Sequence, residues 1–146
     1  MIRENVIIDV IDGLEETQKE VDLRFFFSVA SLRLYEQKTG RNFFKDNEKA
    51  VRTLTEYLVN IDINNVDKLT EQEQVKLAPL LVEPAINKFV FNVLPCLYAK
   101  IQDGKYLQNE ETYEECENSP WFMKLVNLEF FLKIFQELII FQPKKK

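Results

Sequence analysis

The sequence predicts a mainly α-helical single domain of about five helices, with a short β-hairpin at its N-terminus as an option. The chain has 146 residues, which is the size of one compact domain. Hydrophobic residues make up 46% of it and charged residues 29%, which is enough apolar material for a core. Only 3 glycines and 5 prolines are present, and so few turn residues favour long helices joined by few loops. No repeat or linker divides residues 1–146, so we expect one domain.

The N-terminal segment, residues 1–27, is predicted to be extended. Residues 5–11 and 21–27 are both rich in Val, Ile and Phe, and Gly13 lies in the polar stretch between them. Two such runs separated by a turn residue are typical of a β-hairpin. A helix that begins at Glu4 is the competing interpretation.

Residues 28–104 are predicted to be helical. Ser28 is a good cap for a helix that ends at Thr39, where Gly40 supplies a left-handed stop. Val29, Leu32 and either Tyr35 or Glu36 are expected on its buried side.

The next predicted helix is capped by Asp46 or Asn47. Its apolar stripe follows helical spacing and consists of Ala50, Leu54, Tyr57 or Leu58, and Ile61. The turn-rich stretch NIDINNVDK, residues 60–68, follows it.

Thr70 and Glu73 form a capping-box pattern that predicts a short helix up to about Ala78, before Pro79. Another helix is predicted from Glu83 to Gln102, with Pro84 in its first turn, a kink at Pro95 and a stop at Gly104. Its expected stripe is Ile86, Phe89 or Val90, Val93, Leu97 and Ile101.

Residues 105–118 are polar and acidic, which predicts a loop or a weak solvated helix. Ser119-Pro120 is a start signal for a last helix over residues 119–141, which Pro143 ends. Residues 142–146 form a basic tail.

The last predicted helix is apolar almost all round. One face collects Trp121, Leu125, Leu128, Phe131, Leu132, Phe135, Leu138 and Ile139, and a second arc holds Met123, Phe130, Ile134 and Phe141. Either the helix is enclosed by its own domain, or the second arc faces a partner. In the second case Phe130, Ile134 and Phe141 are the candidate anchors, with Lys124 and Lys133 at the rim.

Phe43 and Phe44 are a second candidate partner surface. Adjacent residues of a regular element point to different sides, so one is expected in the core while the other projects outward. A loop that docks both rings is an alternative. A hydrophobic staple before the Asp46 cap is a further one.

Composition argues against catalysis and several ligand classes. The chain has no His, which removes the commonest general base and metal ligand, and two cysteines are too few for a Cys/His zinc site. The net charge is −5 and the body shows no basic face for nucleic acid. No apolar run is long enough and free enough of charge to suggest a membrane span. We therefore expect no enzyme, no cofactor and no metal; an enzyme built on the clustered carboxylates is the weakest hypothesis.

The stretch LYEQKTGRNFF, between DLRFFFS and EKAVRTLTEYL, resembles the tail assembly chaperones of long-tailed, non-contractile bacteriophages of Gram-positive hosts. The matching positions are Glu36, Thr39, Gly40, Arg41, Asn42, Phe43 and Phe44, and the resemblance covers roughly residues 20–60. The second half of the chain matches no pattern.

The resemblance implies a non-catalytic role in the host cell cytoplasm. Such proteins bind apolar helical segments of the tape measure protein, keep them soluble during tail assembly, and are absent from the mature virion. The resemblance also implies self-association and a longer, frameshifted form as further partners, and the lysine codons of Lys144, Lys145 and Lys146 are a candidate slippery run. The alternative hypothesis is a virus-encoded helical bundle that modulates a host protein through an apolar groove.

Overall fold

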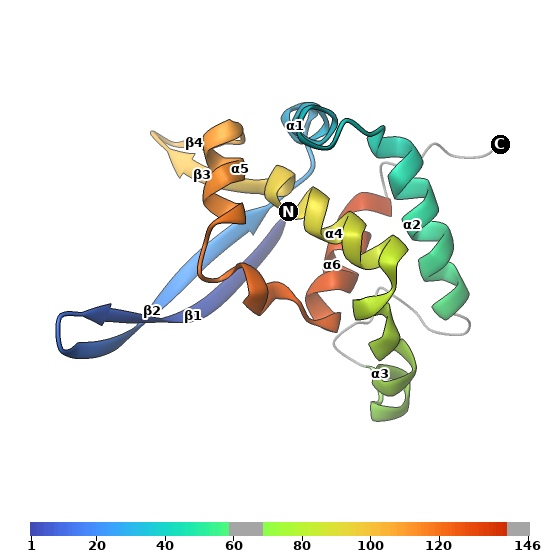
Figure 1. The fold of residues 1–146 in the computed structure, drawn as a ribbon, viewed down its shortest axis with the longest axis horizontal. Coiled ribbons are helices and arrows are strands. Elements are labelled where there is room, and N and C mark those ends of the chain that lie inside the picture. The colour runs from blue at the N-terminus through green and yellow to red at the C-terminus, as the bar shows by residue number, and fades with distance from the viewer. Residues whose placement is uncertain (59–68, 140–146) are drawn as a thin grey trace.

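The computed structural model describes residues 1–58 and 69–139 and shows a mixed α/β fold (Figure 1). These residues form six α-helices and a four-stranded antiparallel sheet in the order β1-β2-β3-β4. The prediction of a mainly α domain is therefore wrong. The error concerns the strands. The N-terminal hairpin is longer than its apolar runs indicated, and a second hairpin, β3–β4, lies partly where the end of a helix was predicted.

The N-terminal hairpin consists of β1 (Ile2–Asp12) and β2 (Glu15–Phe25). Eleven consecutive residue pairs join the strands, from Ile2↔Phe25 to Asp12↔Glu15. Gly13, the first turn residue, has a positive φ of 66°, whereas the second, Leu14, does not have a positive φ. This is the pattern of a type II′ turn. The hairpin option is confirmed and the helix from Glu4 is not. Half of β2 escaped notice because residues 15–20 are all polar and are held in a strand by pairing with β1.

The second hairpin consists of β3 (Tyr98–Gln102) and β4 (Lys105–Leu107). Asp103 and Gly104 both have positive φ, 53° and 77°, as a type I′ turn requires. The predicted helix stop at Gly104 is therefore wrong, because Gly104 belongs to the Asp-Gly turn of this hairpin. The predicted helix from Glu83 to Gln102 is too long for the same reason, since its last five residues form β3. Only two residue pairs, Arg24↔Ala99 and Phe25↔Tyr98, join β2 to β3.

The first two helices are α1 (Val29–Thr39) and α2 (Phe43–Tyr57). The cap at Ser28 and the stop at Gly40 are confirmed. Asn42, and neither Asp46 nor Asn47, caps α2, since the Lys45 N–H donates to Asn42 Oδ1 at 3.0 Å. The staple before Asp46 is therefore wrong. The expected stripe of α1 is partly wrong as well, because Val29 is 65% exposed while Ser31, Leu34 and Tyr35 are buried.

Three helical segments follow the undescribed residues 59–68: α3 (Glu71–Leu77), the 3₁₀ helix η2 (Ala78–Val82) and α4 (Pro84–Leu97). The predicted capping box is present, because the Glu73 N–H donates to Thr70 Oγ1 at 3.2 Å and the Thr70 N–H donates to Glu73 Oε1 at 3.0 Å. Helix α4 ends at Leu97, two residues after Pro95. The expected stripe is buried up to Leu97, whereas Ile101 is exposed in β3.

The acidic segment, residues 105–118, contains β4 and a helix, α5 (Glu110–Glu117). Of the two predictions for this segment, the loop is wrong and the helix is confirmed over Glu110–Glu117. Asn109 caps α5, since the Thr112 N–H donates to Asn109 Oδ1 at 3.0 Å. Thr112 and Cys116, four residues apart, form the buried side of α5. The glutamates occupy the remaining, solvated surface of the helix.

The last α-helix, α6 (Leu128–Ile139), begins later than predicted and follows a short 3₁₀ helix, η3 (Phe122–Leu125). The Ser119 hydroxyl does not cap it, because it donates to the Cys116 carbonyl at 2.8 Å. Asn127 caps it instead and accepts from the Phe130 N–H at 2.8 Å. The predicted end near Phe141, the basic tail and the connection over residues 60–68 lie outside the described residues.

The two residues of the second arc that lie in α6, Phe130 and Ile134, do not form a surface. Phe130 is 1% exposed and Ile134 is 0% exposed, so neither can serve as a partner anchor in this fold. The other buried residues of α6 are Phe131, Leu132, Phe135 and Leu138. Helix α6 is thus enclosed by its own domain, the first of the two interpretations. Phe141, the third proposed anchor, is outside the described part of the chain.

An aromatic cluster joins α6 to the sheet. The Phe25 ring meets Phe130 edge-to-face with centroids 5.4 Å apart, and it meets Trp121 in the same way at 6.4 Å. On the helical side, Phe89 of α4 lies 6.2 Å from Phe135. The core therefore runs from the base of the hairpin through α6 to α4.

We expect Phe130→Ala to lower the free energy of unfolding by about 3–5 kcal/mol, because it leaves a cavity beside Phe25 and Trp121. Met123→Ala is the matched control, since Met123 lies nearby in the chain but is 67% exposed, and it should change stability by about 0.5 kcal/mol or less. Urea unfolding followed by circular dichroism measures both. Equal stability of the two variants would contradict the buried position of Phe130.

Candidate functional site

The most conspicuous feature of the surface is the part of the β1–β2 hairpin that extends beyond the body of the molecule (Figure 1). We call residues 5–22 the arm. Pairing of β2 with β3 is confined to Arg24 and Phe25, so β2 has no second neighbour along the arm. Within residues 1–58 and 69–139, no strand lies on the outer side of β1.

The arm has one apolar face that continues the core. Paired residues of an antiparallel hairpin point to the same side, so the even-numbered residues of β1 share a face with the odd-numbered residues of β2. At the base this face is buried, as Ile2, Leu23 and Phe25 show. Farther out the same face carries half-buried apolar residues, namely Val6, Ile8, Val10 and Val21. The opposite face adds Ile7 and Ile11, which are 54% and 76% exposed.

Three polar contacts anchor the base of the arm to the last part of the chain. Lys133 Nζ lies 2.8 Å from Glu4 Oε1, and the N-terminal amino group lies 3.3 Å from Glu137 Oε2. The Lys124 ammonium donates to the Ile7 carbonyl. The hydrogen bond to Glu4 is the main reason that the pKa of Lys133 is raised. Lys124 and Lys133, proposed above as the rim of a partner patch, thus hold the arm in place.

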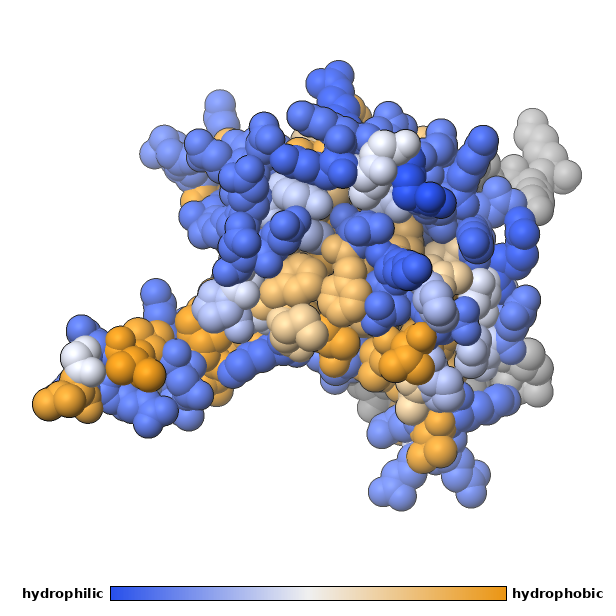
Figure 2. All heavy atoms as spheres, in the orientation of Figure 1, coloured by the Kyte–Doolittle hydropathy of each residue, from blue (hydrophilic) through white to orange (hydrophobic). Residues whose placement is uncertain are grey.

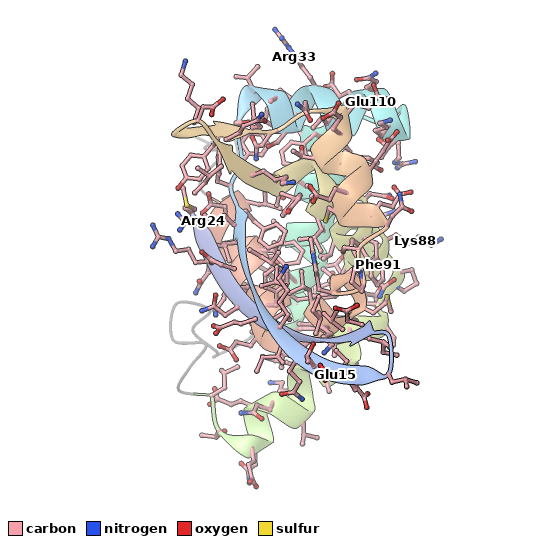
Figure 3. The ribbon with its side chains drawn as sticks, turned by 90° about the vertical axis from the view of Figure 1, so that its left-hand side faces the viewer. Glu15, Arg24, Arg33, Lys88, Phe91 and Glu110 are labelled. Carbon is pink, nitrogen blue, oxygen red and sulfur yellow. The ribbon has the colours of Figure 1, made fainter. Side chains whose placement is uncertain are left out.

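Several apolar areas gather on the side of the molecule shown in Figure 2. They lie along the arm, in the middle of the body, and over η2 and α3. Phe91 of α4, which Figure 3 shows on this side, is half-buried and stacks on Phe122 of η3 with centroids 5.7 Å apart. The exposed apolar residues of η2 and α3 are Val82 (77%) and Val75 (74%). We refer to this side, with the arm, Phe91, Phe122, Val82 and Val75, as the apolar face.

The stretch that carries the phage resemblance forms the corner between α1 and α2. Gly40 adopts a left-handed conformation with a φ of 67°, and its N–H donates to the Glu36 carbonyl at 2.9 Å. The Arg41 N–H donates to Thr39 Oγ1 at 3.1 Å. Asn42 caps α2. Phe43 is 0% exposed, whereas Phe44 is 39% exposed and meets the Phe43 ring edge-to-face at 5.4 Å. Each of these residues has a role in shaping the corner, and Phe44 alone of the two phenylalanines reaches the surface.

A polar cluster lies beside this corner. Arg41 binds Asp46 with two hydrogen bonds, from Nε to Oδ2 at 2.8 Å and from Nη2 to Oδ1 at 3.0 Å, and the Tyr35 hydroxyl donates to Oδ2 at 2.6 Å. These bonds hold the pKa of Asp46 below its usual value, and hydrogen bonding to Arg41 makes the largest contribution. Burial, reinforced by the bond to Asp46, raises the pKa of Tyr35.

A cavity of about 290 Å³ opens next to the cluster, lined by Lys49 and Lys88 among others. Asp46 is already satisfied by Arg41 and Tyr35, so this carboxylate is not poised for proton transfer. Sequence reasoning gave Asp46 a capping role and missed its ion pair, although Arg41 and Asp46 flank the start of α2 at a distance of five residues.

The other reactive side chains are buried. Cys96 and Cys116 are both free thiols at 0% exposure, and burial raises the pKa of Cys96 to about 12. Burial is also the main cause that raises the pKa of Cys116, with smaller contributions from Cys96, Glu117 and Glu115. Over residues 1–58 and 69–139, no group of three or more His, Cys, Asp or Glu side chains could hold a metal ion.

Comparison with family models, with curated proteins and with solved structures found no match to this chain. Within the described part of the chain, no single helix is long and apolar enough to cross a membrane. The segments Glu71–Val82 and Pro84–Leu97, bent by 72°, meet that criterion as a pair by length and composition alone.

We expect Asp46→Asn to lower the free energy of unfolding by roughly 1–3 kcal/mol at pH 7, because it breaks hydrogen bonds to a charged group. The pKa of Asp46 is depressed in the folded state, so its contribution is complete above the ordinary carboxyl pKa and disappears as the pH falls through the depressed value. When the pH is lowered from 7 to below about 4, the free energy of unfolding of the variant should therefore fall less than that of the natural chain.

Urea unfolding at a series of pH values measures this effect. Glu48→Gln removes the same charge from an exposed i,i+4 pair with Arg52 (3.0 Å) and is the matched control, with little expected change. Parallel pH curves for the natural chain and Asp46→Asn would contradict the assignment.

Proposed function

We propose that this protein is a non-catalytic tail assembly chaperone that binds apolar helical segments of a phage tape measure protein and keeps them soluble until the tail forms. It would act in the host cell cytoplasm and be absent from the finished virion. The resemblance over Glu36–Phe44 supports the family, and the apolar face supports a binding role. The apolar face is the observation on which the proposal depends.

The position of this surface differs from the one first expected. Helix α6 cannot supply it, because Phe130 and Ile134 are inside the core. The apolar face is instead assembled from the arm, α4, η2, η3 and α3, which are far apart in the sequence (Figures 1 and 2). Because it spans several elements, it offers an elongated row of apolar contacts, which suits a long helix with an apolar stripe.

The exposure of the apolar face is large enough to matter for binding. Val82 and Val75 keep about three quarters of their surface in water, and burying one such side chain fully is worth roughly 1.5–3 kcal/mol. Phe91 and Phe122 add an aromatic pair that is already ordered by stacking, so little conformational entropy is lost when a partner covers it. Clustered apolar side chains on a surface usually mark an interaction site.

The double variant Val75→Asp/Val82→Asp should abolish the ability of the protein to keep a tape measure protein soluble. Two buried, unpaired carboxylates at a helix-binding surface oppose association strongly. Co-expression with the tape measure protein of the same phage, followed by comparison of soluble and pelleted fractions and by co-purification, measures the effect.

Val29→Asp/Ile101→Asp is the matched control, because it adds the same charge at two apolar residues that are 65% and 54% exposed on α1 and β3. This variant should retain the soluble complex. If the tape measure protein precipitates equally with and without the natural chain, the proposed function is wrong. A tight one-to-one complex with a host protein, and none with the tape measure protein, would favour the alternative of host modulation.

A further inference from the structure

We propose that the outer edge of β1 in the arm accepts an extended, cationic segment of a partner protein as an additional β-strand. The segment would alternate apolar residues with Lys or Arg. This inference goes beyond the proposed function, because it concerns the backbone edge of β1, whereas the apolar face binds through side chains. The partner segment is also extended, whereas the tape measure segments are helical.

The backbone of β1 has hydrogen-bonding groups that face away from β2. The two-residue turn closes on the pair Asp12–Glu15, so even-numbered residues of β1 point their N–H and C=O groups toward β2 and odd-numbered residues point theirs outward. The Lys124 ammonium donates to the Ile7 carbonyl, which fits this alternation. Beyond Ile7, the described residues supply no partner for the outward groups of Asp9 and Ile11.

Over residues 6–12, this edge lacks proline, lysine and bulges, and its charged side chains, Asp9 and Asp12, are both acidic. Exposed edge strands are commonly interrupted by proline, lysine or a β-bulge, which prevents pairing with other chains. Residues 6–12, VIIDVID, contain neither proline nor lysine, and the eleven pairs between β1 and β2 run without a bulge. The stretch has a high β propensity.

The charge of the arm selects the partner. It carries six carboxylates, of Asp9, Asp12, Glu15, Glu16, Glu20 and Asp22, against the single ammonium of Lys19. The resulting charge of −5 equals that of the whole chain. Among these carboxylates only Asp22 has an ion pair with a residue that the structure describes, namely Arg24 at 3.3 Å. A second arm would be repelled by this charge, whereas a cationic segment would be attracted.

The two faces of the arm differ in polarity, so successive residues of the added strand, which point to opposite faces, should alternate between apolar and cationic. Side chains on the even face would lie beside Ile8 and Val10, which favours apolar residues. Side chains on the odd face would lie beside Asp9, with Glu16 and Glu20 on the next strand. Lys and Arg suit this face, because their aliphatic stems can cover Ile7 and Ile11 while their charges reach the carboxylates.

The test uses the full chain and synthetic peptides of about eight residues, long enough to span the open edge around Asp9 and Ile11. A peptide that alternates Val and Lys should bind at least about tenfold more tightly than one that alternates Val and Glu, with an affinity that falls as salt rises. A peptide with the same Val and Lys content arranged at helical spacing is the control for shape, and it should bind more weakly. Titration by fluorescence anisotropy measures all three.

Ile11→Pro tests strand addition directly. Proline removes an outward N–H that β2 does not use, so the arm should persist while the alternating Val–Lys peptide binds about tenfold more weakly. Ile11→Ala keeps the N–H, removes most of the side chain and should bind more tightly than Ile11→Pro. Hydrogen exchange should show that the peptide protects the amides of Asp9 and Ile11 in the natural chain.

Charge is tested separately with Asp9→Asn/Glu16→Gln/Glu20→Gln, which should weaken binding and its salt dependence. Glu71→Gln/Glu111→Gln/Glu114→Gln changes the net charge equally on α3 and α5 and should leave binding unchanged. The proposal is overturned if the helical-spacing peptide binds best, if Ile11→Pro and Ile11→Ala bind equally, or if the arm associates with a second copy instead. Loss of tape measure binding alone would overturn the proposed function and leave this inference standing.

Discussion

The fold depends on the enclosure of α6. A helix with apolar residues on nearly every side must be surrounded, and no single neighbour can do this. The sheet base covers it through Phe25, α4 reaches it through Phe89, and α2 and η2 also contact it. Phe25 at the end of β2 and Phe27 just before α1 both pack in or against this core, so the connection between β2 and α1 lies beside it.

Local chemistry was predictable where neighbours in sequence decide the conformation. The cap at Ser28, the stop at Gly40 and the box of Thr70 and Glu73 depend on residues within one turn of each other, and all three are confirmed. The polar half of β2 and the short strand β3 depend on partners elsewhere in the chain, so their own composition carries little signal. Asp103-Gly104 was a readable hairpin signal that the apolar run before it concealed.

The same distinction explains the candidate site. An amphipathic pattern states that a residue is apolar, and only the tertiary structure states whether that residue is covered. Phe130, predicted as a partner anchor, is therefore buried in the core, whereas Val82, which no sequence pattern indicated, is exposed. The corner residues of the phage-like stretch are explained by capping and packing. A short sequence resemblance can therefore reflect the geometry of a helix–helix corner as much as a shared binding surface.

The two residue pairs between β2 and β3 have a consequence for cooperativity. The arm has its own ladder of hydrogen bonds but contributes few side chains to the interior, and ion pairs at Glu4 and Glu137 secure its root. Such an appendage can open without dissolving the rest of the molecule. We therefore expect two cooperative units of unequal strength, with amides of the outer arm exchanging at a lower opening free energy than those of α4 and α6.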